Sequence, residues 1–284
     1  MKNVIVLGAN GQLGLTFREF ESKEGFNFTF YSRKEVDITD SKSLDRVFYK
    51  SSFHYCINCA AYTNVDLAEK EQEEAFKVNA IGPKNIAEIC NELDIILIQI
   101  STDYVFDGTS SAPYKEDNVT EPLNIYGRSK RDGEHNIVCN TKKYYIVRTS
   151  WLYSKYLSNF LKTVIRKIKN NETLYITNSE IGTPTQSSDL AEFILYLIED
   201  GQVEYGVYHF SARGSTSWYG FARHIVNLYD SKKISKIKPV DHFDTIATRP
   251  KYSVLDLEKT EAVYKELSTW EESSQKLLSR YDFS

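Results

Sequence analysis

At 284 residues, with 41% hydrophobic and 26% charged residues, the chain has the size and composition of a globular protein with a sizeable core. Its formal net charge is −4 and its Lys and Arg residues are dispersed, which argues against nucleic acid as a partner. No apolar run approaches the roughly 20 residues of a membrane helix, and the short apolar run near the N-terminus cannot form a signal-peptide core. We therefore expect a cytoplasmic protein without a membrane partner.

The first half of the chain alternates short apolar runs with amphipathic stretches. Strands are predicted at residues 4–7, 26–31, 55–60, 95–100 and 144–147, and helices at 12–20, 41–49, 71–93 and 123–138. This alternation predicts an α/β fold, in which a Rossmann-type doubly wound parallel sheet is covered on both faces.

The second half is less regular. Helices are predicted at 156–169, 188–198, 218–228 and 270–278, strands at 174–176 and 207–210, and a loop at 232–249. No linker separates the two halves. We expect residues 1–150 to form an NAD(P)-binding domain and residues 151–284 to form mainly a smaller substrate-binding cap, with segments at about 174–200 returning to the core.

A glycine-rich turn follows the first predicted strand and opens the first predicted helix. Its sequence is GANGQLG, from Gly8 through Asn10 and Gly11 to Gly14. In this setting glycines permit a tight turn and a close approach to a pyrophosphate, which then faces the helix N-terminus. A tight turn that binds no nucleotide is the alternative interpretation.

The end of the second predicted strand bears on the choice of cofactor. An NAD-selecting acid is usual near this point, but the chain has Ser32, Arg33 and Lys34 there. These groups favour the 2′-phosphate of NADPH, with NADH possible as a second cofactor, whereas a solvated basic turn fits the pattern equally well. Asp37, which is followed by Ile38, could meet the adenine amino group; Asp40 could cap the next helix.

Tyr126 and Lys130 form a Y-x-x-x-K pair on a predicted helix. Residues four apart share one helix face, so the phenol and the ammonium can enter one site. We expect Lys130 to lower the pKa of Tyr126 and so prepare it for proton exchange with a ketone oxygen, while also hydrogen-bonding the nicotinamide ribose. Tyr229 and Lys233 share the spacing, but no Ser/Thr strand end precedes them.

Two further strand ends complete the predicted site. Thr102 follows the strand at 95–100 and could donate a hydrogen bond to the substrate carbonyl beside Tyr126. The small residues Ala60 and Ala61 would let the third strand end lie against the adenosine of a dinucleotide. A plain buried strand end is the alternative for this segment.

Cys56 and Cys59 form a C-x-x-C on the third predicted strand. Residues three apart on a strand point to opposite faces, and no second C-x-x-C or His pair accompanies them. We interpret both as buried structural cysteines rather than as a redox pair or half a zinc site.

Taken in order, these segments resemble the dTDP-4-dehydrorhamnose reductase family of the extended short-chain dehydrogenases. The resemblance covers nearly the whole chain, and STDYVFDG is its most specific stretch. The matching stretches are GANGQLG (8–14), NCAAYTNVDLAE (58–69), STDYVFDG (101–108), YGRSK (126–130), RTSWLY (148–153), GTPT (182–185) and RPKYSVLD (249–256).

The resemblance implies an NADPH-dependent reduction of the 4-keto group of a deoxythymidine diphosphate sugar, the step that yields dTDP-L-rhamnose, by a monomer or homodimer. It assigns catalysis to Thr102, Tyr126 and Lys130. Substrate contacts are expected at Thr102, Tyr126, Asp103, Trp151 and Arg249. Beyond the pair Tyr126 and Lys130, cofactor contacts are expected at Gly8, Asn10, Gly11, Gln12, Leu13, Gly14, Ser32, Arg33, Asp37, Ile38, Ala60, Ala61, Tyr62 and Thr63.

The chain departs from the family at the positions of a metal site. Some members hold magnesium at a dimer interface through glutamates, but Thr16 stands at the first such position and Asp189 could replace only a second. We therefore predict no metal.

Three other functions share parts of this sequence pattern. A nucleotide-sugar 4,6-dehydratase would need a Glu where Tyr104 stands. A non-catalytic subunit resembling the methionine adenosyltransferase regulatory subunit, and a reductase of a different nucleotide keto-sugar, remain as alternatives.

Overall fold

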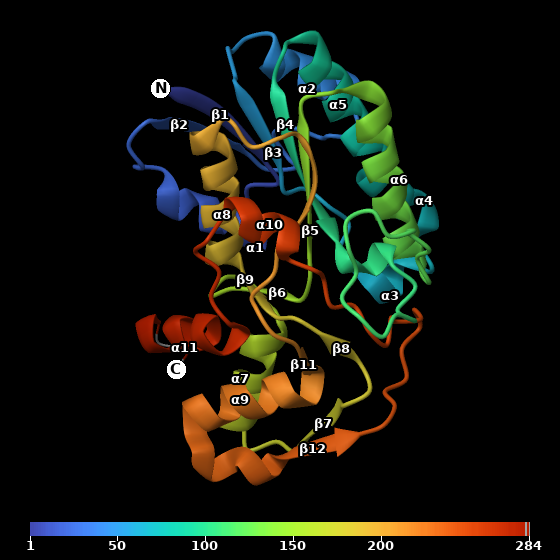
Figure 1. Ribbon diagram of the computed structural model, residues 1–284, viewed down its shortest axis with the longest axis vertical. Coiled ribbons are helices and arrows are strands. Elements are labelled where there is room, and N and C mark those ends of the chain that lie inside the picture. Colours follow the sequence, from blue (N-terminus) through green and yellow to red (C-terminus); the bar gives the residue numbers. More distant parts are fainter. Residues whose placement is uncertain (282, 284) are drawn as a thin grey trace.

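The computed structural model describes residues 1–281 and 283, and a six-stranded parallel sheet forms its frame (Figure 1). In the strand order β10-β5-β4-β3-β1-β2 the direction in which successive strands are added reverses between β1 and β3, which is where open α/β sheets bind ligands. This sheet confirms the predicted Rossmann-type doubly wound fold. Its strands are β1 (Lys2–Leu7), β2 (Phe26–Tyr31), β3 (Tyr55–Asn58), β4 (Ile96–Thr102), β5 (Tyr144–Thr149) and β10 (Gly206–His209).

Helices cover both faces of the sheet because its strands are apolar on both sides. On one face α2 (Ser41–Phe48), α5 (Gly82–Glu92) and α6 (Ile125–Asn140) pack over Ile5, Leu7 and Leu97. On the other face α1 (Gln12–Phe17) and α8 (Ser187–Asp200) pack over Val4 and Val6.

The long helix predicted at 71–93 is interrupted. It consists of α4 (Gln72–Phe76), a π-helical turn at Lys77–Ile81, and α5. Pro83, near the start of α5, has no N–H to donate and would crowd the carbonyl of Asn79 in a regular α-helix. The wider turn resolves this conflict, and it directs the Asn79 side chain to the backbone of Tyr62 and to Ser129 on α6.

A smaller lobe lies below the sheet in Figure 1 and has its own apolar core. It is built from α7 (Phe160–Lys169), α9 (Trp218–Asp230), α11 (Trp270–Arg280) and the parallel pair β7 (Leu174–Thr177) and β12 (Ile237–Val240). The loop predicted at 232–249 is wrong in its first part, which contains β12. The polar residues of that stretch do not form the apolar pattern of a strand, and β12 is paired with β7, which is distant in sequence.

Short elements connect the lobe to the sheet. β6 (Leu152–Tyr153) pairs with β9 (Thr185–Gln186), and β8 (Ile181–Gly182) pairs with β11 (Thr216–Ser217). Within residues 174–200, β7 belongs to the lobe, whereas α8 packs against α1 on the central sheet. Helices α3 (Val65–Ala68) and α10 (Glu258–Val263) complete the fold. The division of function at residue 150 remains a prediction.

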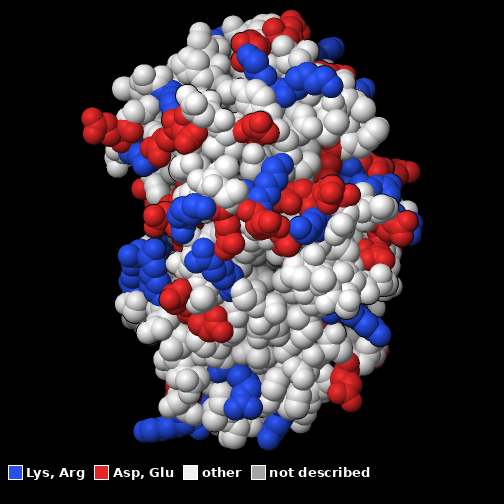
Figure 2. All heavy atoms as spheres, in the orientation of Figure 1, with Lys and Arg blue, Asp and Glu red and all other residues white. Residues whose placement is uncertain are grey.

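Charges of both signs are interspersed across the middle of the face drawn in Figure 2. Such mixing creates no large single-sign field on this face. Within the described residues, none of the helices combines the length and the apolar composition that a bilayer crossing would require.

Gly8 is a point where the fold depends on the absence of a side chain. Its φ is +76°, and a Cβ atom there would lie 2.5 Å from the backbone N of Ala60. Gly25 is a matched control, since its φ is +87° but a Cβ atom would meet nothing within 4 Å.

We expect Gly25→Ala to cost about 1 kcal/mol of unfolding free energy through backbone strain alone. Gly8→Ala should cost about 1–3 kcal/mol more, because β1 and β3 would be forced apart. Urea unfolding of both variants measures the difference, and equal losses would show that the contact with Ala60 does not constrain the fold.

Candidate active site

A cavity of about 560 Å³ opens at the carboxyl ends of β1, β3, β4 and β5. It brings together most of the residues predicted for the reacting centre. Those lining it are Gly11, Gln12, Leu13, Ala60, Ala61, Thr63, Thr102, Asp103, Tyr126, Lys130 and Trp151. The other predicted residues lie outside its lining: Gly8, Asn10, Gly14, Ser32, Arg33, Asp37, Ile38, Tyr62 and Arg249.

The glycine turn is a close-packed backbone structure beside this cavity. A Cβ atom at Gly14 would lie 2.4 Å from the carbonyl oxygen of Gly8, so the start of α1 rests directly on the turn. At Gly11 a Cβ atom would meet only that same oxygen, at 3.3 Å, so the outer side of the turn is open. A turn open on one side and followed by a helix N-terminus fits a pyrophosphate.

Tyr126 is held in the first turn of α6. Asn124 caps the helix by accepting a hydrogen bond from Gly127 N at 2.8 Å. A Cβ atom at Gly127 would lie 2.1 Å from the carbonyl oxygen of Tyr104, so glycine lets α6 approach the end of β4. The rings of Tyr126 and Tyr104 then meet edge to face, with centroids 5.9 Å apart.

The Thr102 hydroxyl lies between the end of β4 and the following turn. It donates to Asp103 Oδ1 at 3.1 Å and accepts from Tyr104 N at 3.1 Å. Burial raises the pKa of Asp103 to about 7, although the hydroxyls of Ser253 and Thr102 lower it. The strand end thus presents a hydroxyl and a buried carboxyl group that titrates near neutral pH.

The protonation of the Tyr126–Lys130 pair differs from the sequence prediction. Burial raises the pKa of Tyr126 to about 12, although the Thr102 hydroxyl lowers it. Burial also lowers the pKa of Lys130 to about 8, and its ammonium donates to the carbonyl oxygen of Ile100 at 2.6 Å. The expected lowering of the tyrosine pKa by Lys130 is therefore wrong for this structure, because burial has the largest effect on Tyr126 and the ammonium turns to Ile100 instead.

Two stacked indoles form the wall of the cavity on the side of the smaller lobe. The rings of Trp151 and Trp218 are parallel within 9°, with centroids 3.6 Å apart. Trp151 has a φ of +45°, and a Cβ atom at Gly182 would lie 2.6 Å from its indole. Trp218 also donates from Nε1 to Glu180 Oε2 at 3.1 Å. Trp218 was not predicted from the sequence, since nothing local distinguishes it from a core residue at a helix start.

The residues at the end of β2 are already engaged with carboxylates. Glu35 accepts from the backbone N and the hydroxyl of Ser32, at 2.8 and 2.7 Å. Arg33 Nη2 donates to Glu74 Oε1 at 2.6 Å, with the Arg33 side chain 67% exposed. An exposed ion pair of this kind is weak, so Arg33 is free to change partner.

The neighbouring predicted residues have structural partners as well. Asp37 Oδ1 accepts from the backbone N and the hydroxyl of Thr39, at 2.9 and 2.8 Å. Ile38 is buried against Gly82. Asp40 caps α2, which confirms the prediction that it could cap this helix.

Arg249 lies at the edge of the site rather than in its lining. Its Nη2 pairs with Asp66 Oδ2 at 3.3 Å, and Asp66 Oδ1 accepts from Ala247 N at 3.1 Å. Burial raises the pKa of Glu180, and the charge of Arg249 lowers it. The loop before Arg249 is therefore fastened to α3 beside the site.

The cysteines divide between two cores. Cys56 is buried beneath one face of the sheet. Cys59 packs toward the other face, as predicted, but it follows the end of β3, is half-buried and lines the cavity. The prediction that it lies within a buried strand is wrong, and burial nevertheless raises the pKa of its thiol, which stays protonated at neutral pH.

The two positions compared with magnesium ligands are occupied by other contacts. Thr16 Oγ1 donates to the carbonyl oxygen of Gln12 and lies 2.8 Å from Ser187 Oγ. Asp189 Oδ2 accepts from Ser273 Oγ at 2.5 Å. Among residues 1–281 and 283, no three His, Cys, Asp or Glu side chains cluster as metal ligands. That the protein needs no metal remains a prediction.

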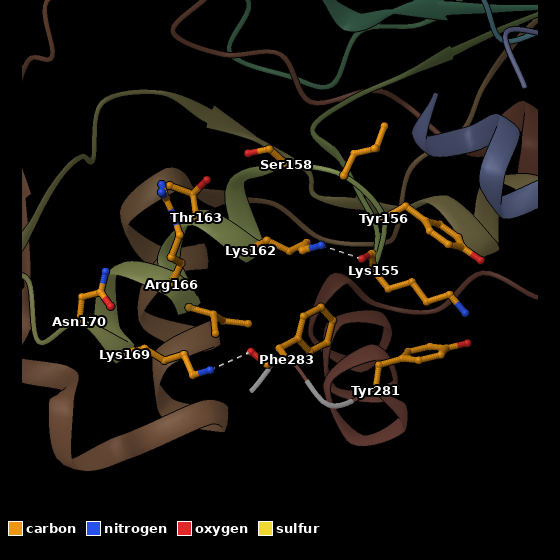
Figure 3. A pocket seen from close by; sticks show the side chains of 12 residues that line it. Lys155, Tyr156, Ser158, Lys162, Thr163, Arg166, Lys169, Asn170, Tyr281 and Phe283 are labelled. Atoms are coloured by element: carbon orange, nitrogen blue, oxygen red, sulfur yellow. Dashed lines mark hydrogen bonds between the residues drawn. The ribbon is translucent and has the colours of Figure 1, made fainter. Parts of the chain in front are cut away.

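A second cavity, of about 920 Å³, runs along α7 and the C-terminal residues (Figure 3). Two of its lysines have backbone partners: Lys162 Nζ donates to the carbonyl oxygen of Lys155 at 3.0 Å, and Lys169 Nζ donates to that of Phe283 at 3.5 Å. The ammonium of Lys155 pairs with Glu19 Oε2 at 3.0 Å. None of the predicted catalytic residues lines it. The smaller cavity is therefore the candidate active site.

Comparison with known proteins gives a consistent picture. A family described as "RmlD substrate binding domain" matches residues 1–283. A dTDP-4-dehydrorhamnose reductase from Aggregatibacter actinomycetemcomitans is 35% identical over 275 residues, covering 93% of this chain and 94% of that protein. A dTDP-4-keto-6-deoxy-D-glucose reductase from Streptomyces niveus is 36% identical over 255 residues, covering 88% and 87%.

A similar solved structure contains a bound dinucleotide. It is a dTDP-4-dehydrorhamnose reductase from Bacillus anthracis in complex with NADP, with a TM-score of 0.92 and 39% identity over 99% of this chain and all of that one.

Proposed function

Since this chain belongs to the RmlD substrate binding domain family, we propose that it is an NADPH-dependent reductase that converts the 4-keto group of a deoxythymidine diphosphate sugar to an alcohol. The preferred substrate is dTDP-4-dehydro-L-rhamnose and the product is dTDP-L-rhamnose. The observation that carries the proposal is the convergence of Thr102, Tyr126 and Lys130 on one cavity beside the open glycine turn.

The protonation states suit a reduction. NADPH, when bound, supplies a hydride to the carbonyl carbon, and a proton must reach the oxygen. With a pKa near 12, Tyr126 carries that proton at neutral pH and can release it as charge develops on the oxygen. When the keto-sugar binds, the Thr102 hydroxyl turns from Asp103 to donate to the same oxygen. The Lys130 ammonium turns from the Ile100 carbonyl to stabilise the phenolate that remains.

The rest of the proposed site divides by chemistry. The turn residues Gly8, Asn10, Gly11, Gln12, Leu13 and Gly14 face the pyrophosphate, and Ala60, Ala61, Tyr62 and Thr63 lie along the dinucleotide. Ser32, Arg33, Asp37 and Ile38 serve its adenosine end. Asp103, Trp151 and Arg249, joined by Trp218, contact the nucleotide sugar.

The direct test is incubation with NADPH and dTDP-4-dehydro-L-rhamnose, followed by identification of the product. We expect one dTDP-L-rhamnose for each NADPH oxidised. Tight NADPH binding without turnover of this or any other nucleotide 4-keto-sugar would contradict a reductase and would favour the regulatory subunit.

Tyr126→Phe should reduce kcat by about 10²–10⁴-fold, because the ring and its packing remain while the acidic proton is lost. NADPH binding should survive. Tyr229→Phe is the control, since Tyr229 packs against the core of the smaller lobe and should not affect turnover. The opposite pattern would mean that the wrong Y-x-x-x-K pair has been assigned.

The cofactor preference should depend on Arg33 and its partner. Charge-assisted hydrogen bonds contribute roughly 1.5–3 kcal/mol, so Arg33→Ala should weaken the preference for NADPH over NADH by about tenfold. Glu74→Gln releases Arg33 from its ion pair and should strengthen that preference. Ratios of kcat/KM for the two cofactors measure both effects. If the ratio for NADPH over NADH is the same in the unmutated protein and in both variants, Arg33 is only a solvated turn residue and does not bind the cofactor.

Trp218→Leu should raise KM for the keto-sugar by about two- to tenfold, since aromatic stacking contributes roughly 0.5–1.5 kcal/mol. The KM for NADPH should not change. Trp218→Phe keeps an aromatic face against Trp151 and should recover most of the affinity. If Trp218→Leu and Trp218→Phe have the same KM for the keto-sugar, the indole stack does not contribute to sugar binding.

A further inference from the structure

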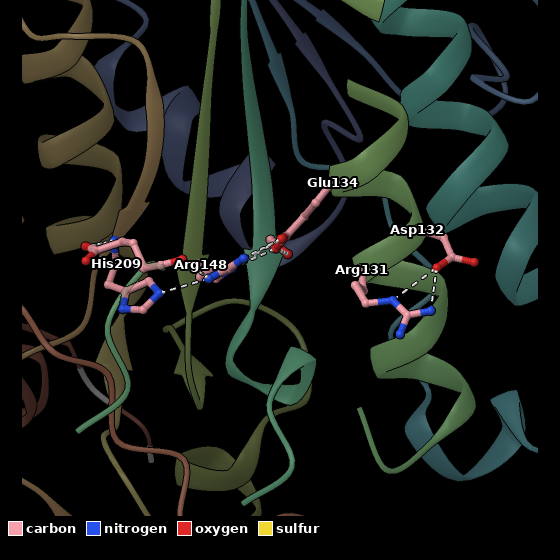
Figure 4. A network of polar contacts seen from close by, with 7 residues as sticks. Arg131, Asp132, Glu134, Arg148 and His209 are labelled. Carbon is pink, nitrogen blue, oxygen red and sulfur yellow. Dashed lines mark hydrogen bonds and ion pairs between the residues drawn. The ribbon is translucent and has the colours of Figure 1, made fainter. Parts of the chain in front are cut away.

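A buried ion pair joins α6 to β5 (Figure 4). Glu134 on α6 and Arg148 on β5 have side chains only 8% and 6% exposed. Arg148 Nη2 donates to Glu134 Oε2 at 2.7 Å and Arg148 Nε to Oε1 at 3.0 Å, so the contact is bidentate.

Arg148 is fixed by further contacts, and none of those made by the described residues 1–281 and 283 supplies a second carboxylate. Its Nη1 donates to the carbonyl oxygen of Glu116 at 3.1 Å and lies 3.4 Å from His209 Nε2. Burial and the Arg148 charge lower the pKa of His209 to about 3, so the ring is neutral. The guanidinium also lies over the ring of Phe106, 5.2 Å from its centroid.

The same carboxylate reaches the reacting centre through β4. Ser101 Oγ donates to Glu134 Oε1 at 2.5 Å, and Ser101 both lines the cavity and precedes Thr102. Glu134 therefore connects three elements, since it is carried by α6 and bound to β4 and β5. It lies one helical turn beyond Lys130, on the same helix face.

Glu134 also opposes the desolvation of Lys130. The groups that face the Lys130 ammonium are the carbonyl oxygen of Ile100 on β4, the Cys59 thiol after β3 and Glu134 on its own helix. Glu134 is the carboxylate among them. Burial lowers the pKa of Lys130, and the charge of Glu134 raises it.

We propose that Glu134 is a positioning residue for the reaction, which keeps Lys130 charged and fastens the Ser101–Thr102 strand end to the helix that carries Tyr126. The inference rests on the proposed function, in which Lys130 and Thr102 act together. This role explains why a carboxylate is buried at this point. It pairs directly with Arg148 and stabilises the charge of Lys130 through space.

The test compares Glu134→Gln with two other variants. Glu134→Gln leaves Arg148 buried without a counter-charge and can destabilise the fold. The double variant Glu134→Gln/Arg148→Met removes both charges of the pair and should restore thermal stability. Asp132→Asn is the control on the same helix, since Asp132 is exposed and pairs with Arg131 (Figure 4).

Two pH profiles are measured between pH 6 and 10: kcat/KM for the keto-sugar, and the Kd of NADPH from its fluorescence. Loss of the Lys130 proton should weaken both above about pH 8 in the unmutated protein. In Glu134→Gln and in the double variant the alkaline limb should move down by about one pH unit, the size of effect that a neighbouring opposite charge produces. Asp132→Asn should leave it unchanged.

An unmoved alkaline limb in the folded double variant would overturn the role of Glu134, as would NADPH binding that does not vary with pH in the unmutated protein. The binding profile requires no sugar. A failure of the proposed reduction, seen as no turnover, is therefore distinguishable from a failure of this inference.

Discussion

The structure depends on the close backbone contact between the turn after β1 and the chain after β3. The strand order reverses between these two strands, since α1 crosses to one face of the sheet and α2 to the other. The turn can fill the gap only because Gly8 lacks a Cβ atom that would strike Ala60. What remains is an opening at the strand ends, and every candidate catalytic group projects from a strand or helix that borders it.

Burial gives these groups their chemical character. The sheet and helices shield Tyr126, Lys130 and Asp103 from water, and this burial favours the neutral form of each group. It raises the pKa of Tyr126 and of Asp103 and lowers that of Lys130. For a reductase this is useful in Tyr126, because a proton donor must arrive protonated. It is unfavourable in Lys130, whose charge is needed, and the buried Glu134 compensates for it.

The sequence predicted those features that depend on neighbours in the chain. Strand runs, the glycine turn and the helical spacing of Tyr126 and Lys130 are local patterns, and the sheet and the cavity confirm where they lie. Trp218, Glu134 and Arg148 were missed because their significance lies in partners that are distant in sequence. The lowered pKa expected for Tyr126 failed for a related reason: spacing shows that two side chains share a face, but not that an ammonium turns to the Ile100 carbonyl instead.

Trp151 shows how the smaller lobe is coupled to the sheet. It lies two residues beyond the end of β5, and its left-handed φ of +45° is strained by about 1–2 kcal/mol for a residue with a side chain. The strain is offset by contacts from the lobe, where Gly182 leaves room for the indole and Trp218 stacks on it. If the lobe moved away, Trp151 would lose both contacts and keep the strain. The position of the lobe and the conformation of the site wall are therefore set together, which accounts for a chain that passes repeatedly between lobe and sheet rather than joining them by one linker.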